Sequence, residues 1–256
     1  MISMNAAVYT SLVRAKRLGE KQFAVLVDPE KARRDPLLSL CALAERCGAD
    51  FIFVGGSTLV KDTMAECVET IKSNCSLPVV LFPGSNKQVH PAADALLLLS
   101  LISGRNAEWL INQHVEAAFS LKQSGLEIIP TGYVLIDGGR ETSVTYVSQT
   151  RPIPSDKSDI AAATALAGVQ LGLKVIYMDA GSGALKPVSQ KMLRAVAREI
   201  EVPLIVGGGI DNETKARKAC AAGADVVVVG NALEKEPLLL LRLASAVHER
   251  VEVRQA

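Results

Sequence analysis

The sequence predicts an α/β protein that folds as a (β/α)8 barrel of the TIM type. A length of 256 residues suits one large domain, which we place at 1–256 with an N-terminal helix at about residues 5–18. Short apolar runs alternate with amphipathic stretches along almost the whole chain. The runs are apolar throughout, which is typical of parallel strands that helices cover on both faces.

Eight apolar runs are the predicted strands: 23–28, 51–56, 78–83, 95–100, 127–136, 174–180, 203–208 and 225–230. Helices are predicted at 35–48, 57–73, 106–125, 159–172, 187–200, 211–223 and 236–252. Glycines that are typical of helix C-termini end four of them, namely Gly48, Gly125, Gly172 and Gly223. GADFIFVGG and GADVVVVGN repeat one helix-end-to-strand unit.

Two connections are expected to be unusual. Residues 84–94 are short and contain Pro91, so the third helix of the barrel should be irregular. Residues 138–158 are polar and long for a loop after a strand, which indicates a lid or a binding loop. The rival fold is a doubly wound open sheet, but it predicts GxGxxG after the first strand, where this chain has VDPEK.

The composition narrows the class of protein. The residues are 49% hydrophobic and 4% aromatic, which predicts an aliphatic core, and a formal net charge of +1 without basic runs argues against nucleic acid as a partner. The five cysteines form no CxxC pair and are expected to be packed thiols. The N-terminus lacks an apolar signal core and ALLLLSLI is too short to cross a bilayer, so we expect a soluble, cytoplasmic protein.

Glycine-rich turns follow the last three predicted strands: AGSGA (180–184), GGGID (207–211) and GNALE (230–234). In such barrels ligands bind at the C-terminal strand ends, and phosphate commonly binds after strands 7 and 8. Backbone N–H groups of glycines, which no side chain covers, and helix N-termini both favour the binding of phosphate. A single turn of this kind could be an ordinary turn, but three on adjacent strands indicate a phosphate site.

Acidic and hydroxyl side chains lie at other strand ends. Asp28 and Ser57 offer oxygens of the kind that Mg²⁺ binds, or they are helix N-caps; the residues alone leave both interpretations open. Asp179 stands directly before a glycine-rich turn, where a carboxylate should repel phosphate. No Schiff-base lysine or Ser-His-Asp arrangement is evident, and Trp109 and Tyr133 are interpreted as packing residues.

These motifs resemble the geranylgeranylglyceryl phosphate synthase family, which includes bacterial heptaprenylglyceryl phosphate synthases. The resemblance runs from about Phe23 to Leu233 through VDPEK, FVGGS, LFPGSN, SLISGRN, TGYVLIDGG, YMDAGSGA, VGGGI and VGNALE. It implies a prenyltransferase of ether phospholipid biosynthesis that depends on Mg²⁺. The enzyme would join a prenyl diphosphate, with geranylgeranyl diphosphate expected, to the 3-hydroxyl of sn-glycerol 1-phosphate and release diphosphate.

The resemblance also implies roles for particular residues. Asp28 and Ser57 would hold Mg²⁺, and Asp179 would orient the acceptor hydroxyl and take its proton. Glycerol 1-phosphate would be held by Tyr177, Met178, Asp179, Ala180, Gly181, Ser182, Gly183, Gly208, Gly209, Gly230 and Asn231. The segments SLISG and AAATALAG are candidates for lining an apolar groove for the prenyl chain.

This chain departs from the family at two positions. Many members have Glu at the position of Asp179, and the shorter side chain reaches roughly 1.3–1.5 Å less far, so the role of base is less secure than the hydroxyl contact. Leu26 replaces a lysine found in one branch of the family. Lys31, Arg140 and Arg151 are the candidates to neutralise phosphate instead.

Other functions remain open at this point. The alternatives are a phosphosugar isomerase or lyase on the same phosphate-binding barrel, and a non-catalytic sensor of a phosphate ligand. The sequence does not fix the prenyl chain length. The resemblance implies a homo-oligomer, at least a dimer, and transient proximity to a membrane through the lipid substrate and product.

Overall fold

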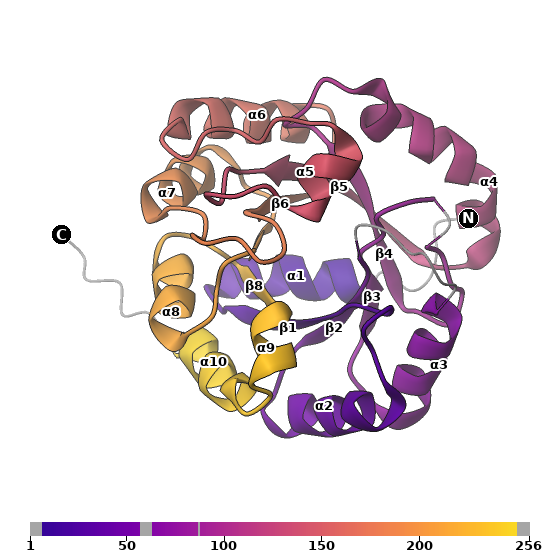
Figure 1. Cartoon of the computed structure of the whole chain (residues 1–256). Coiled ribbons are helices and arrows are strands. Elements are labelled where there is room, and N and C mark those ends of the chain that lie inside the picture. The colour runs from indigo at the N-terminus through magenta and orange to yellow at the C-terminus, as the bar shows by residue number, and fades with distance from the viewer. Residues whose placement is uncertain (1–6, 57–62, 87, 250–256) are drawn as a thin grey trace.

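The computed structural model describes residues 7–56, 63–86 and 88–249, which form a closed barrel of eight parallel strands (Figure 1). Each strand pairs with its neighbours in chain order, and β8 closes the barrel against β1. The predicted (β/α)8 barrel is confirmed, and the open sheet is wrong. The strands are β1 (Gln22–Val27), β2 (Phe51–Val54), β3 (Val79–Leu81), β4 (Ala95–Leu101), β5 (Glu127–Leu135), β6 (Val175–Asp179), β7 (Leu204–Gly207) and β8 (Val226–Val229).

Helices surround the barrel at the predicted places. They are α2 (Arg34–Arg46), α3 (Met64–Asn74), η1 (Glu108–Asn112), α4 (Gln113–Ser124), α5 (Ser143–Ser148), α6 (Ser158–Gln170), α7 (Gln190–Glu199), α8 (Glu213–Ala221), α9 (Asn231–Lys235) and α10 (Leu239–His248). Helix α3, predicted at 57–73, begins at Met64, and residues 57–62 and 250–252 of the predicted helices lie outside the described residues. Among the described helices, none combines the length and hydropathy needed to cross a bilayer.

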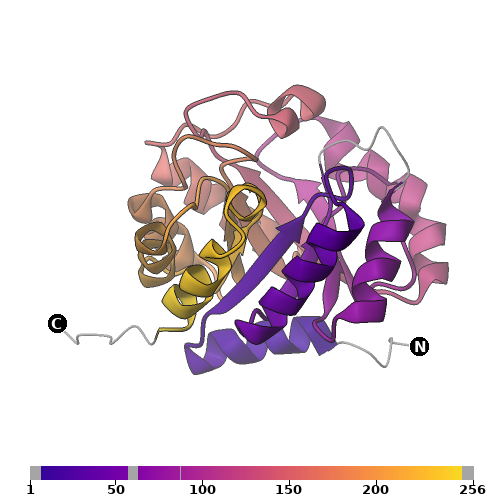
Figure 2. The same ribbon diagram turned by 60° about the horizontal axis from the view of Figure 1, so that its bottom comes forward.

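The N-terminal helix α1 (Ala7–Leu18) lies under the N-terminal end of the barrel, at the bottom of Figure 2. Val8 and Leu12 pack against the interior of the barrel. The Glu127 carboxylate at the start of β5 accepts hydrogen bonds from the backbone N–H groups of Val8 and Tyr9, at 2.9 and 3.0 Å. This carboxylate satisfies free N–H groups of the first turn and so fixes the helix across the N-terminal end of the barrel. The helix does not cover the C-terminal end of the barrel (Figure 2).

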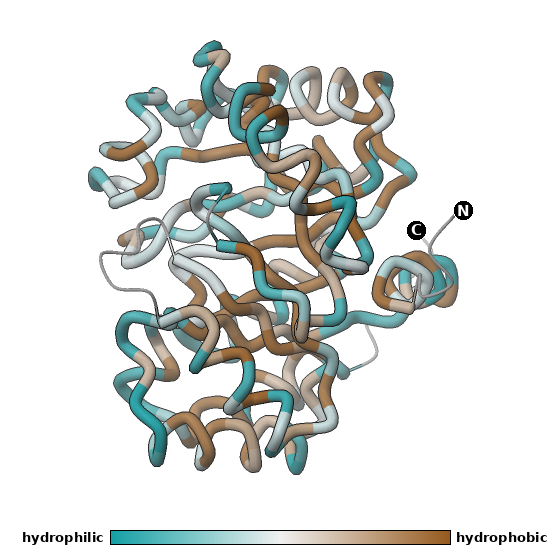
Figure 3. The backbone as a smooth tube through the Cα atoms, turned by 90° about the vertical axis from the view of Figure 1, so that its right-hand side faces the viewer, coloured by the Kyte–Doolittle hydropathy of each residue, from teal (hydrophilic) through white to brown (hydrophobic). Residues whose placement is uncertain are grey.

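Alternate residues of the strands form two separate cores. Side chains such as Phe53, Leu97 and Val228 fill the barrel, and side chains such as Ile52 and Val206 pack outward against the helices. Figure 3 shows the hydrophobic residues of the strands, in brown, running through the molecule. The C-terminal ends of the strands surround the opening of the barrel, which we call the mouth. Because side chains on a strand alternate between the two faces, the last residue of each strand points either into the barrel or toward the helices.

An aspartate before each of three strands ties that strand to its predecessor. The carboxylate of Asp50 accepts from the N–H of Phe23 at 2.7 Å, and that of Asp225 accepts from the N–H of Leu204 at 2.9 Å. Asp94 makes the same contact with Val79. Asp50 and Asp225 are the equivalent residues of the two repeated GAD units, so the repeat reflects a shared way of joining adjacent strands.

The connection between β3 and β4 has no regular helix within its described residues, 82–86 and 88–94, as expected. The four predicted C-terminal glycines all have positive φ: 72° at Gly48, 73° at Gly125, 94° at Gly172 and 111° at Gly223. The polar segment 138–158 contains α5 and lies at the C-terminal end of the barrel, at the top of Figure 2. All five cysteines are free thiols.

Candidate active site

Asp179 ends β6 with its side chain on the interior face, where it is 8% exposed. Its Oδ2 accepts a hydrogen bond of 2.6 Å from the hydroxyl of Tyr133, on the neighbouring strand β5. Its Oδ1 accepts one of 2.7 Å from the N–H of Gly181. Burial and the charge of Asp179 raise the pKa of Tyr133 well above its ordinary value, so the tyrosine keeps its proton and donates.

The environment of Asp179 makes it a stronger base than an exposed aspartate. Burial raises the pKa of its carboxyl above the ordinary value of 3.8, and the hydrogen bonds from Tyr133 and Gly181 oppose that shift. A buried carboxylate of raised pKa can accept a hydrogen bond, and then a proton, from a substrate hydroxyl. Asp179 is therefore suited to general-base chemistry at the mouth of the barrel.

Three aromatic rings surround this carboxylate. The ring of Tyr177 stacks on Phe82 with centroids 4.9 Å apart, and it lies 5.6 Å from the ring of Tyr133. A Cβ atom at Gly207 would lie 2.6 Å from the Tyr177 hydroxyl, so this glycine makes room for the tyrosine. The interpretation of Tyr133 as a packing residue is thus incomplete, since the same side chain packs and also holds Asp179.

The predicted glycine turns after β6 and β7 lie directly beside Asp179. Gly181, Gly183, Gly208 and Gly209 have φ values of 87°, 74°, 80° and 69°, which non-glycine residues rarely adopt. A Cβ at Gly208 would lie only 2.6 Å from Asp179 Oδ1. Backbone conformation therefore favours glycine at all four positions, and the close approach of the carboxylate requires it at Gly208 in addition.

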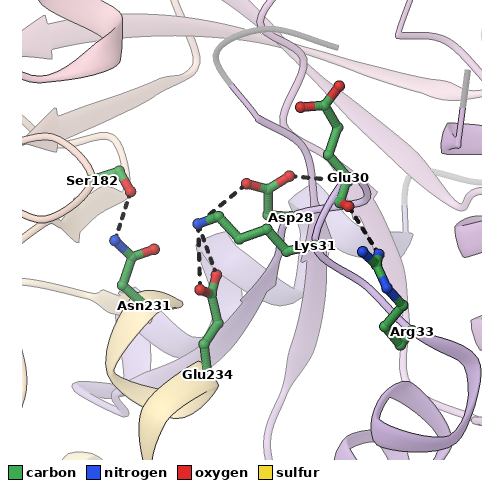
Figure 4. Close-up of polar contacts among 7 residues, drawn as sticks. All are labelled: Asp28, Glu30, Lys31, Arg33, Ser182, Asn231 and Glu234. Carbon is green, nitrogen blue, oxygen red and sulfur yellow. Dashed lines mark hydrogen bonds and ion pairs between the residues drawn. The ribbon is translucent and has the colours of Figure 1, made fainter. Parts of the chain in front are cut away.

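The turn after β8 is joined to the turn after β6. The side-chain amide of Asn231 donates to the hydroxyl of Ser182 at 2.8 Å (Figure 4). A Cβ at Gly230 would lie 3.1 Å from the carbonyl oxygen of Leu26, at the end of β1. The structure thus brings the three predicted turns together at one side of the mouth, although Met178 and Ala180 point outward into the helix-facing core.

Of the three cationic residues suggested by the sequence, two lie at this mouth. A Cβ built on Gly183 would be 4.0 Å from the guanidinium carbon of Arg140, so the guanidinium lies over the turn after β6. Lys31 lies beside Asp28, on the side of β1. Arg151 is exposed and lines an open cleft next to α5, which Arg140 also lines; no contact of Arg151 with the described glycine turns is seen.

Asp28 follows β1 and does not cap a helix, because α2 begins at Arg34 with Arg33 at its N-cap position. Its Oδ1 instead accepts from the N–H of Glu30 at 3.1 Å, which closes a tight turn. Its Oδ2 lies 3.4 Å from Lys31 Nζ. One carboxylate oxygen thus stabilises the loop, and the other faces a charged side chain at the mouth.

Asp28 would hold Mg²⁺ through one carboxylate oxygen, with waters as the other ligands until substrate phosphates replace some of them. Ser57, the second predicted ligand, lies outside the described residues, and among those described no three His, Cys, Asp or Glu side chains converge on a possible metal position. Mg²⁺ in proteins usually keeps several waters and takes one or two carboxylates plus substrate phosphates. A single carboxylate oxygen at the mouth is compatible with that coordination.

An apolar groove opens next to the site, on the side where the barrel lacks a regular third helix. Leu96, Leu98, Leu99 and Leu101 of β4 form its floor, and Tyr133 forms the wall nearest Asp179. The groove is completed by residues of the 83–89 segment, η1, α4 and α5: Pro83, Gly84, Ser85, Asn86, Val89, Trp109, Gln113, His114, Ala117, Leu121, Val144, Val147 and Ser148. Tyr133 therefore belongs to both the groove and the carboxylate site.

Sequence reasoning missed the partners of the predicted residues. The aromatic neighbours Phe82 and Tyr133, and Glu234 beside Lys31, all contact predicted site residues from other strands or loops. The strand alternation places Tyr133 on the interior face and could have indicated its direction. Its hydrogen bond to Asp179 depends on the register of β5 against β6, in which Leu135 pairs with Asp179.

Comparison with known proteins gives consistent results. Residues 16–249 match the PcrB family. The chain is 53% identical over 250 residues to the geranylgeranylglyceryl phosphate synthase of Chitinophaga pinensis, covering 98% of this chain and 99% of that protein. It is 43% identical over 217 residues to the protein of the same name from Thermococcus kodakarensis, covering 84% and 85%.

A solved structure gives the same result for the fold. The (S)-3-O-geranylgeranylglyceryl phosphate synthase of Thermoplasma acidophilum, crystallised in complex with its substrate sn-glycerol-1-phosphate, superimposes with a TM-score of 0.89 at 33% identity, covering 94% of this chain and 98% of that one. The family match spans nearly the whole barrel. The chain belongs to the PcrB family, as an enzyme of the geranylgeranylglyceryl phosphate synthase type.

Proposed function

We propose that the protein transfers a prenyl group from a prenyl diphosphate, with geranylgeranyl diphosphate as the expected donor, to the 3-hydroxyl of sn-glycerol 1-phosphate. One observation carries this proposal. Tyr133 lines an apolar groove with its ring and donates its hydroxyl proton to the buried Asp179. A groove suited to a hydrocarbon chain thus ends at a carboxylate suited to activate a hydroxyl.

The acceptor would bind between Asp179 and the three glycine turns. Backbone N–H groups of Gly183, Gly208 and Gly230 would approach its phosphate, and Arg140 would supply positive charge. Asp179 would bind the hydroxyls at the other end of the molecule, where its charge meets donors and not phosphate. Met178 and Ala180, whose side chains face outward, would contribute only backbone to this contact.

The donor chain would lie in the apolar groove. Leu98 faces the helix layer and Leu99 faces the barrel interior, and both are only partly buried. Burial of such surface by a prenyl chain stabilises the complex by about 25 cal/mol per Å². Leu101 of the predicted SLISG segment lines the groove, whereas no residue of AAATALAG is in its described lining.

The reaction would break the bond between C1 of the prenyl group and the diphosphate oxygen, and form a bond from C1 to the glycerol oxygen. The hydroxyl proton would pass to Asp179, which holds the oxygen in line. Asp28, with Ser57, would hold Mg²⁺, whose charge stabilises a departing diphosphate. Diphosphate would leave after the transfer.

The test is product formation by purified protein from labelled sn-glycerol 1-phosphate and prenyl diphosphates of different length, with and without Mg²⁺. We expect a prenylglyceryl phosphate only when both substrates and Mg²⁺ are present, and loss of turnover in Asp28→Asn, which keeps the contact to Glu30. Turnover of a phosphosugar without any prenyl diphosphate would instead support an isomerase or lyase.

A further inference from the structure

Lys31 bridges two carboxylates that come from opposite ends of the chain. Its Nζ lies 3.4 Å from Asp28 Oδ2 and 3.2 and 3.3 Å from the two carboxylate oxygens of Glu234 (Figure 4). Asp28 follows β1 and Glu234 belongs to α9, and they meet because β8 pairs with β1. The ammonium thus stands between the proposed metal ligand and the turn after β8.

The surroundings keep Lys31 charged. The carboxylates of Asp28 and Glu234 both face its ammonium and favour the charged form. A divalent cation bound to Asp28 would repel this ammonium across a few ångströms. The Lys31 ammonium and a divalent metal cannot both contact Asp28 Oδ2, so the ammonium must move away when the metal binds.

The loop allows Lys31 to give way without refolding. The backbone N–H groups of Lys31 and Ala32 both donate to the carbonyl of Asp28, at 3.1 and 3.0 Å, and Asp28 Oδ1 is held by the N–H of Glu30. The turn is therefore fixed, while the Lys31 side chain is 50% exposed and free to reorient. Glu234 gives the ammonium a second partner at the mouth when Asp28 is occupied.

Resting on the proposed function, we propose that Lys31 is an exchangeable counter-ion for the donor diphosphate. In the free enzyme it neutralises Asp28; when a metal takes Asp28, Glu234 retains the ammonium beside the site, where it binds a phosphate of the donor. The donor and not the acceptor is the partner, because Lys31 shares Asp28 with the proposed metal while Arg140 lies over the turn at Gly183.

The proposal predicts opposite changes in two affinities for Lys31→Met. Mn²⁺ binding to the free enzyme, measured by electron paramagnetic resonance of unbound Mn²⁺, should tighten about twofold to fivefold, because a competing exposed ion pair is lost. Binding of magnesium pyrophosphate, measured by calorimetry, should weaken about tenfold to a hundredfold, because a charge-assisted contact is lost. Binding of glycerol 1-phosphate should change less than about threefold.

Two further variants serve as controls. Lys218→Met removes the same charge from an exposed position of α8 and should change neither affinity. Lys31→Arg keeps the charge and should retain both affinities within about threefold. Thermal unfolding of each variant shows that the comparison is made between folded proteins.

The outcomes separate this inference from the proposed function. If wild-type enzyme binds Mn²⁺ no better than Asp28→Asn does, the metal assignment in the proposed function fails. If wild-type enzyme binds Mn²⁺ and Lys31→Met binds it equally or more weakly, Lys31 does not compete for Asp28 and the inference is wrong. A loss of glycerol 1-phosphate binding as large as the loss of pyrophosphate binding would also overturn it.

Discussion

Asp179→Asn should cost the protein only about 1–3 kcal/mol of stability while removing most of its activity. The asparagine oxygen can still accept from the N–H of Gly181, and its amide can donate to the Tyr133 hydroxyl, which then accepts. The reversed bond leaves the buried Tyr133 hydroxyl proton without its acceptor, and an unpartnered buried donor costs about 1–3 kcal/mol.

The stability difference should depend on pH with a defined sign. The folded protein raises the pKa of Asp179 above its ordinary value of 3.8, so the native state binds this proton more tightly than the unfolded chain. The contribution of the group to stability is complete below pH 3.8 and is lost as the pH rises through the folded pKa. Asparagine does not titrate, so the variant should gain stability relative to wild type across that window.

The activity should fall for a different reason. Loss of a positioned general base typically slows the chemical step by about 10²–10⁴-fold, which corresponds to roughly 3–5 kcal/mol in the barrier. Single-turnover rates with labelled glycerol 1-phosphate measure this step, and urea unfolding at several pH values measures the stability. Asp137→Asn is a matched control, because Asp137 makes the equivalent contact to the N–H of Gly139 from an exposed position.

One result would refute this reasoning. If Asp179→Asn reacts at the wild-type rate at pH 7, the carboxylate serves the local fold and not the acceptor. A loss of activity in Asp137→Asn as large as that in Asp179→Asn would show that the assay reports a general effect of charge.

Four further substitutions test the rest of the site. Gly230→Ala, at a glycine of ordinary negative φ, should raise the KM for glycerol 1-phosphate at least about tenfold and that for the prenyl donor far less; equal effects would mean that the two phosphate sites are reversed. Tyr133→Phe should destabilise the protein by about 1.5–3 kcal/mol at pH 7 and move the acidic limb of the pH–rate profile upward, because its hydrogen bond lowers the pKa of Asp179; an unmoved limb contradicts this. Arg140→Met should raise the KM for glycerol 1-phosphate roughly tenfold and Arg151→Met should not, as steady-state kinetics on both variants would show.

The barrel was predictable because its signals are local and mutually consistent. Each strand is an apolar run that needs no partner to be recognised, and glycines such as Gly125 mark where a helix must turn back. The repeat of Asp50 and Asp225 indicated one recurring unit, although only the structure shows that each aspartate binds the preceding strand. Local periodicity therefore determines the order of elements, and closure follows from pairing β8 with β1.

The site was less predictable because its contacts join residues far apart in the sequence. Asp28 was equally compatible with a helix cap and a metal ligand, and the start of α2 at Arg34 depends on how the loop after β1 folds. The pairing of Lys31 with Glu234 spans almost the entire chain and exists only in the closed barrel. Sequence patterns identify which residue types reach the mouth, and strand register decides which of them meet.

The glycines that suggest a phosphate site also explain why Asp179 can stand directly before a glycine-rich turn. Because Gly208 has no Cβ, Asp179 Oδ1 can sit beside the turn and accept from the N–H of Gly181, while Oδ2 is held by Tyr133. Both oxygens have donors, which spreads the negative charge into the barrel wall. A carboxylate held this way could stand next to the proposed phosphate, whose contacts would come from Gly183, Gly230 and Arg140. Because these glycines have no side chain, they would leave room both for the phosphate of the proposed ligand and for the carboxylate of Asp179.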